Sequence, residues 1–218
     1  MRYLSEQELA ALFDVQGVFY NQNGMQCRRF LDIKRKNVNI DKNDLSVVMM
    51  NPGNSSPKNI DEKTCTDYLN KFVEANPDKT QFQIMRVMEN CGFNYAKIIN
   101  LSDVRCTSSD EFYKMHGDDQ RNIEYSIFSE SNKHHIKTYL NPQSLFIYAW
   151  GVDTKLQCLA EQALRVLNSN EFWGEKINNT GIPHPDRDYS YYHPLPKNND
   201  EQIEWVKKIT EKTSALKL

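Results

Sequence analysis

The stretch that most constrains the fold is residues 45–57, LSVVMMNPGNSSP, in which an unbroken apolar run enters a small polar loop. A continuous apolar run is typical of a strand buried on both faces, as in a parallel sheet. Pro52 has no N–H for a ladder and Gly53 permits unusual backbone angles, so the strand is expected to end at Asn51. The polar loop then falls where open α/β sheets bind ligands. An ordinary strand-to-helix connection would also explain this stretch.

Composition narrows the class of protein. The 218 residues carry a formal net charge of -2, so no overall basic field marks a nucleic-acid-binding protein, and such a partner would need a local patch. No linker divides the chain, which predicts one domain over residues 1–218. No apolar run reaches the ~18 residues of a membrane span, and the amino terminus lacks a signal peptide's apolar core. We therefore expect a cytoplasmic protein with no membrane partner.

The five cysteines are scattered without a CxxC pair, which argues against a disulfide framework, a zinc site or an iron–sulfur cluster. Reduced thiols, with no metal and no cofactor, are the expectation. His134 and His135 are adjacent on a predicted helix and so point to different faces. They are interpreted as surface residues rather than as a metal-binding pair.

Hydrophobic periodicity predicts the remaining elements. Strands are expected at 45–50, 95–101, 144–150 and, more weakly marked, 176–180, with a hairpin at 17–36 before them. Helices are expected at 5–13, 61–75, 80–90, 119–140, 156–167 and around Trp205. Strands that alternate with helices predict a three-layer α/β/α sandwich with a central, mainly parallel four-stranded sheet, plus the N-terminal hairpin.

The second strand of that hairpin is the most basic segment of the chain. It contains Arg28, Arg29, Lys34, Arg35 and Lys36. A solvated strand face and a contact to phosphate are both compatible with this pattern.

Four motifs in order resemble those of the uracil-DNA glycosylase superfamily. NPGNSSP is similar to its first motif, nearest the mismatch-specific branch, and KIINLSDVR resembles the strand whose terminal Asn reads a flipped base. LFIYAWG resembles the apolar strand that ends in Trp-Gly, and PHP or HPLP is similar to the closing His-Pro motif. The chain also resembles an uncharacterised bacterial family with Asn-Pro-Ser/Gly, Trp-Gly and His-Pro-Leu motifs. The resemblance covers roughly residues 45 to 196.

The resemblance implies a monofunctional DNA glycosylase that flips out and hydrolyses a modified or mismatched pyrimidine, leaving an abasic site. Asn51 would hold the attacking water, and Asn100 would read the base unless it is only a strand-end cap. Either His184 or His193 would donate to the base, unless both merely stiffen turns. The expected partner is DNA, double-stranded with a flipped base or single-stranded, bound by a monomer in repair or in defence against phage DNA.

Further positions follow from the same resemblance. A tyrosine stands at the position of Gly53 in the uracil-specific branch and blocks the C5 edge of the base. Glycine therefore implies a pocket open to C5 substituents. Pro52 and Tyr68 complete the expected base pocket, and the expected DNA contacts are Ser55, Ser56, Arg105, Arg187 and Tyr191. A nucleoside or nucleotide hydrolase on the same scaffold and a non-catalytic DNA-binding module remain alternatives.

Overall fold

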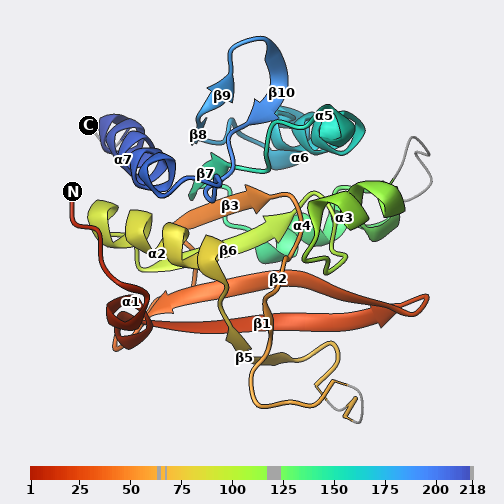
Figure 1. The fold of residues 1–218 in the computed structure, drawn as a ribbon. Helices are drawn as coiled ribbons and strands as arrows, with labels where there is room; N and C mark the ends of the chain where they lie inside the picture. Colours follow the sequence, from red (N-terminus) through yellow and green to blue (C-terminus); the bar gives the residue numbers. More distant parts are fainter. Residues whose placement is uncertain (63–64, 67, 117–123, 217–218) are drawn as a thin grey trace.

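A computed structural model describes residues 1–62, 65–66, 68–116 and 124–216, and in these residues eight strands form one mixed sheet (Figure 1). The strands are β1 (Phe13–Gln22), β2 (Met25–Arg35), β3 (Leu45–Met49), β4 (Ser56–Pro57), β5 (Phe72–Asn76), β6 (Tyr95–Asn100), β7 (Leu145–Tyr148) and β8 (Asn179–Gly181). Their order across the sheet is β4-β5-β1-β2-β6-β3-β7-β8. A separate ribbon pairs β9 (Pro183–His184) with β10 (Arg187–Tyr191).

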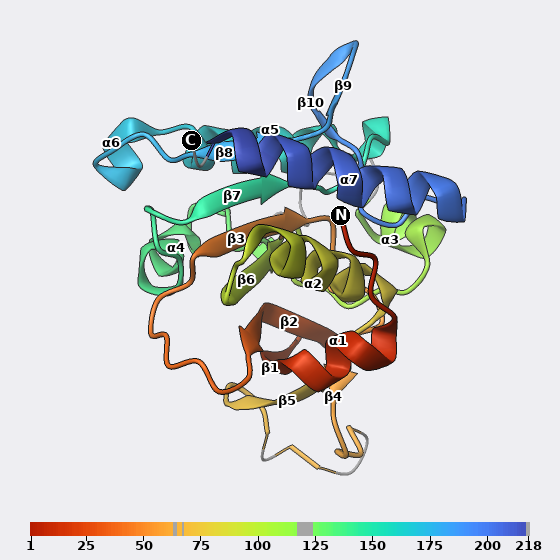
Figure 2. The same cartoon turned by 90° about the vertical axis from the view of Figure 1, so that its left-hand side faces the viewer.

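Helices cover both faces of the sheet. They are α1 (Glu6–Leu12), α2 (Lys79–Cys91), α3 (Ser109–His116), α4 (Lys133–Tyr139), α5 (Gln157–Leu167), α6 (Asn170–Trp173) and α7 (Asn199–Leu216). The first two and α7 lie on one face, and α3 to α6 lie on the other (Figures 1 and 2). No helix within the described ranges is long and apolar enough to cross a membrane.

The strand β3 explains the continuous apolar run. It pairs in parallel with β6 on one side and with β7 on the other. Val47 and Met49 pack toward α2, whereas Val48 packs toward the helices of the opposite face. Because both faces are covered, every position of this strand is buried and apolar or internally hydrogen-bonded.

The expected four-stranded central sheet is not confirmed. The strands β6, β3, β7 and β8 are parallel neighbours, but β2 pairs antiparallel with β6 and continues the same sheet. The edge of the hairpin carries backbone groups that need partners, and Leu31 opposite Ile98 supplies apolar side chains for the shared core. The hairpin is therefore an internal part of the sheet, and β5 and β4 extend it further.

Two predicted helices are wrong in the residues that the structure describes. Within 61–75 the chain turns at Asn70, whose φ of 58° interrupts any helix, and Phe72 begins β5 against β1. Residues 63, 64 and 67 lie outside the described ranges. Of the apolar residues at helical spacing, Cys65, Tyr68 and Leu69 pack into the core from a loop, whereas Phe72 of β5 is exposed.

Among the described residues of 119–140, the α-helix is limited to α4, and residues 117–123 lie outside the described ranges. Before α4, Ser126 accepts from the Phe128 N–H, and Asn132 donates to the Ser126 carbonyl. Such short-range bonds compete with helix formation. In contrast, α2 matches its prediction, and Gly92 forms its left-handed C-cap with φ 71°.

The basic residues at 28–36 have partners within the protein, although all of them except Arg28 are partly exposed. Arg28 is fully buried, Arg35 pairs with Glu89 at 2.6 Å, and Lys36 donates to a backbone carbonyl. The remaining two cations lie over tyrosine rings, Arg29 over Tyr20 and Lys34 over Tyr95. These groups are occupied within the protein.

A buried ion pair joins the two halves of the sheet. Lys97 of β6 contacts Asp32 of β2, and the Tyr95 hydroxyl donates to the same carboxylate at 2.6 Å. Burial lowers the pKa of Lys97, and Asp32 opposes that shift. The ammonium also lies 4.3 Å from the centroid of the Phe30 ring.

We predict that Asp32→Ala lowers the free energy of unfolding by about 3–5 kcal/mol, because it leaves Lys97 buried without its counter-ion. Urea denaturation measures this change. The double variant Asp32→Leu/Lys97→Met, which removes both charges, should lose much less stability. Equal losses in the two variants would contradict this account of the pair.

Candidate active site

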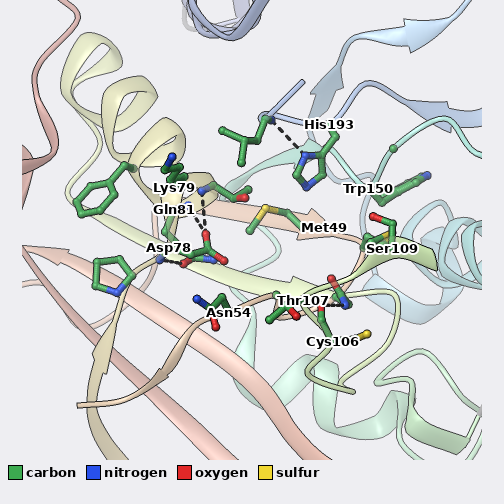
Figure 3. A pocket seen from close by; sticks show the side chains of 18 of the residues that line it. Met49, Asn54, Asp78, Lys79, Gln81, Cys106, Thr107, Ser109, Trp150 and His193 are labelled. Carbon is green, nitrogen blue, oxygen red and sulfur yellow. Dashed lines mark hydrogen bonds between the residues drawn. The ribbon is translucent and has the colours of Figure 1, made fainter. Parts of the chain in front are cut away.

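A cavity of about 650 Å³ opens at the carboxyl ends of β3 and β7, beside the amino terminus of α2 (Figure 3). Its volume lies within the roughly 300–1,000 Å³ of small-molecule sites. Polar groups reach it from Asn51, Asp78, Thr107, Ser109 and His193. Aromatic surface comes from Phe82, Tyr113 and Trp150. The cavity lies where the sequence predicts a ligand site.

Asn51 lies two residues after the end of β3 and lines the cavity. Its side-chain nitrogen donates to the Cys106 carbonyl at 2.7 Å, which fixes the plane of the amide. One N–H of the amide is used in this bond, which leaves the second N–H and the side-chain oxygen of Asn51 for a ligand. The structure thus supports a polar role for Asn51 in the cavity.

Asp78 is a cavity residue that sequence reasoning missed. It is the N-cap of α2, where one carboxylate oxygen accepts from the backbone N–H groups of Thr80 at 2.8 Å and Gln81 at 3.2 Å. Gln81 completes the capping box by accepting from the Asp78 N–H at 2.6 Å. The spacing of Asp78 and Gln81 before the helix at 80–90 was the available signal. It indicates a cap and says nothing of the cavity.

The glycine at 53 has a local explanation. Gly53 has φ 62°, a left-handed conformation that favours glycine, and it lies against Asp78. A Cβ at this position would stand 2.8 Å from the second carboxylate oxygen of Asp78. Both the backbone conformation and this close approach favour glycine here. Its presence alone therefore does not indicate a pocket opened for C5 substituents.

The structure distinguishes the two candidate histidines. His193 lines the cavity, whereas His184 belongs to β9 in the projecting ribbon, outside the cavity wall, and stacks on Tyr192. The Leu195 N–H donates to Nδ1 of His193 at 3.2 Å, so the proton of the neutral ring lies on Nε2. Burial lowers the pKa of His193 to about 4, and the carboxylate of Asp78 partly opposes this. His193 is therefore a neutral hydrogen-bond donor at pH 7.

Hydrogen bonds around the loop of residues 181–196 hold His193 in place. Trp150 Nε1 donates to the Tyr189 carbonyl at 2.8 Å, and the Gly151 N–H donates to the Tyr191 carbonyl at 2.8 Å. Trp205 of α7 donates to the Tyr192 carbonyl at 2.9 Å, one residue before His193. The Trp-Gly motif is thus hydrogen-bonded to the segment that directly precedes the His-Pro-Leu motif.

The other expected base-binding residues do not line the cavity. Asn100 is fully buried, and with its amide oriented to satisfy both neighbours it donates to the Asn51 carbonyl at 3.0 Å. Pro52 is buried beneath the loop, where its carbonyl accepts from Arg28. Tyr68 is buried, and its hydroxyl donates to Glu62 at 3.1 Å. Asn100 and Pro52 thus belong to the layer of residues beneath the Asn51–Gly53 loop.

The expected DNA contacts are also held within the protein. Ser55 is fully buried, and Ser56 starts β4. Arg105 pairs with Glu62 and Arg187 donates to the Val152 carbonyl, both at 2.5 Å, while the Tyr191 ring packs on Tyr148 and Trp150. These five residues do not form a cluster.

Charge in the cavity wall is low. The charged side chains lining it are the carboxylates of Glu6 and Asp78 and the ammonium of Lys79, and His193 is neutral. Such a wall suits an uncharged ligand group better than a phosphate. In the described part of the chain, no group of three or more His, Cys, Asp or Glu side chains is arranged to hold a metal ion.

We predict that His193 makes stability depend on pH. The folded protein keeps this ring neutral to about pH 4, whereas the unfolded chain protonates it near pH 6.5. The unfolded state therefore binds more protons between these values, and stability falls as pH drops from about 6.5 to 4. Urea unfolding at pH 7 and pH 5 measures the loss.

His193→Gln should reduce this loss, and His184→Gln should retain it. A wild-type pH dependence in His193→Gln would contradict the assignment of a neutral ring at position 193.

Comparisons with known proteins give a family. No curated protein matches the chain. Among solved structures, a mutant feruloyl esterase module from Clostridium thermocellum, complexed with sinapinate, matches with 8% identity and a TM-score of 0.33, over 98% of this chain and 67% of that chain. A likeness that low carries no argument. The family described as "Protein of unknown function (DUF1643)" matches residues 32–195, and the protein therefore belongs to the DUF1643 family.

Proposed function

We propose that this protein is a DNA glycosylase that hydrolyses the N-glycosidic bond of a flipped, modified or mismatched pyrimidine. The observation that carries the proposal is that Asn51, Asp78 and His193 line one cavity at the carboxyl ends of parallel strands. The order of motifs that resemble the uracil-DNA glycosylase superfamily supports it from the sequence.

Asn51 and Asp78 would act on the attacking water, and His193 would act on the departing base. The side-chain oxygen of Asn51 and the carboxylate of Asp78 accept hydrogen bonds from a water that attacks C1′ of the sugar. As the new C1′–O bond forms, the C1′–N1 bond breaks, and its electron pair stays on the base. The water proton passes to Asp78 and then to solvent, and the departing base takes a proton from solvent.

Negative charge on the departing base is where His193 acts. Its Nε2–H donates to a ring carbonyl of the pyrimidine as charge builds there. Because the ring is already neutral and fixed by Leu195, the donor needs no reorganisation during the reaction. The aromatic wall of Phe82, Tyr113 and Trp150 provides apolar surface for an extruded base.

The charge of the cavity wall bears on the alternative of a nucleotide hydrolase. A free nucleotide would bring its phosphate close to Asp78 and Glu6, with Lys79 as the one cation among the described lining residues. A base extruded from DNA leaves its phosphates outside the cavity. The wall therefore favours a base, and a nucleoside hydrolase remains the second candidate.

The test is base excision from oligonucleotides that carry uracil, a thymine mismatch or C5-modified cytosines, with abasic sites revealed by alkali. We expect excision from at least one of these substrates. His193→Gln should lower the rate by about 10²–10³-fold, the usual effect of removing one preset donor. Asn51→Ala and Asp78→Asn should also lower it.

His184→Gln is the matched control and should keep the wild-type rate. The absence of abasic sites from the whole panel would refute the proposal, and release of base from free nucleosides alone would favour the second candidate. An equal loss in the variants of His184 and His193 would refute the assigned donor.

A further inference from the structure

Arg28 is a buried cation outside the cavity wall. It lies on β2, and its side chain has no exposed surface. Burial lowers its pKa to about 10, so the guanidinium stays charged at neutral pH. No carboxylate lies within ion-pair distance among the described residues, and its Nε has no hydrogen-bond partner. Burying a cation without an ion-pair partner costs free energy of folding.

A β-bulge sets the direction of this side chain. Val18 pairs with Phe30 and Phe19 pairs with Arg28, so Arg29 is the extra residue of β2. Residues that pair across antiparallel strands share a face, and Phe19 packs on the face covered by α2, whereas Val18 and Phe30 pack on the other. Regular alternation would place Arg28 on the face of Phe30. The bulge turns the Arg28 side chain to the face that is covered by α2.

From there Arg28 reaches across β6 to the loop after β3. One terminal nitrogen donates to the Pro52 carbonyl at 3.4 Å, and the other donates to the side-chain oxygen of Asn100 at 3.3 Å. Asn100 donates in turn to the Asn51 carbonyl at 3.0 Å. The guanidinium therefore contacts the Pro52 carbonyl directly and the Asn51 carbonyl through the Asn100 side chain.

We propose that Arg28 is a positioning residue that fixes the Asn51–Gly53 loop through Asn100 and Pro52. The carboxylates that act electrostatically on Arg28 are Asp78, from the cavity wall, and Asp103. The cation thus supports both the loop and the carboxylate that faces it. The family match begins at residue 32, so this assigns part of the site to a residue of the hairpin that lies outside the matched region.

Loop geometry tests the proposal independently of activity. Arg28→Met replaces the buried cation by an apolar side chain, a change that folded proteins often tolerate. Arg28→Lys keeps the charge but cannot form the two-pronged contact. Both variants, and Asn100→Ala, should shift the backbone amide resonances of Gly53 and Asn54 in two-dimensional ¹H–¹⁵N spectra.

The matched control is Arg86→Met. Arg86 is also buried and also donates to a backbone carbonyl, that of Leu4 at 2.9 Å, but it lies along α2 away from the cavity. This variant should leave the resonances of Gly53 and Asn54 in place. Wild-type loop resonances in Arg28→Met and Asn100→Ala would overturn the proposal, whether or not the protein is a glycosylase.

A kinetic measurement rests on the proposed function. On a substrate that the wild type excises, Arg28→Met should lower kcat by about 100-fold, the scale of a 1 Å misplacement, with little change in KM. The double variant with Asn100→Ala should show less than the product of the two single effects, because both act through one contact. Independent, multiplying effects or an unchanged kcat would overturn the proposal.

Discussion

The parallel pairing of β3 between β6 and β7 is the constraint on which the site depends. The two neighbours and the helices on both faces leave β3 no exposed surface, so its residues must be apolar or internally paired. Beyond Met49, where the strand ends, Met50 and Asn51 are only half-buried, and Asn51 is the first polar residue of the loop. Backbone hydrogen bonds hold the neighbouring chain segments to the end of β3. The Leu101 N–H donates to the Met49 carbonyl at 2.8 Å, and the Ala149 N–H donates to the Val48 carbonyl at 2.9 Å. Three chain segments therefore leave the sheet at fixed positions around one cavity.

The polar residues near this edge of the sheet differ in charge and in the groups that they contact. His193 is kept neutral by burial, and its tautomer is set by Leu195. Asp78 uses one oxygen to cap α2 and turns the other toward Gly53. Arg28 supplies a positive charge from beneath the loop without lining the cavity. A neutral donor and a carboxylate acceptor on one wall suit a reaction in which charge separates between a sugar and its base.

Local pattern predicted the elements whose burial is continuous or whose caps are strong. The runs at 45–50 and 95–101 gave β3 and β6, and the helix at 80–90 with Gly92 gave α2. The segments at 61–75 and 119–140 failed because tertiary pairing and side-chain bonds to the backbone outweighed helical spacing. The hairpin was found, but its pairing with β6 is a long-range choice that periodicity does not contain.

In the site, too, some residues could be predicted from local sequence and others could not. Asn51 could be found because it ends an apolar run. The choice of His193 over His184 needed the contacts of Trp150, Gly151 and Trp205 with the closing loop, which join distant parts of the sequence. Asp78 was visible only as a helix cap, and Arg28 only as one of several basic residues in β2. The one-residue β-bulge at Arg29 determines on which face of the sheet the Arg28 side chain lies.

The most direct test of the central claim is the ¹⁵N spectrum of the His193 ring during titration with free pyrimidine bases, the products of the proposed reaction. The account predicts that Nδ1 and Nε2 of His193 shift on binding while the ring stays neutral with its proton on Nε2, and that the His184 ring does not respond. A response of His184 instead, protonation of His193 at neutral pH, or no response to any pyrimidine at saturating concentration would contradict it.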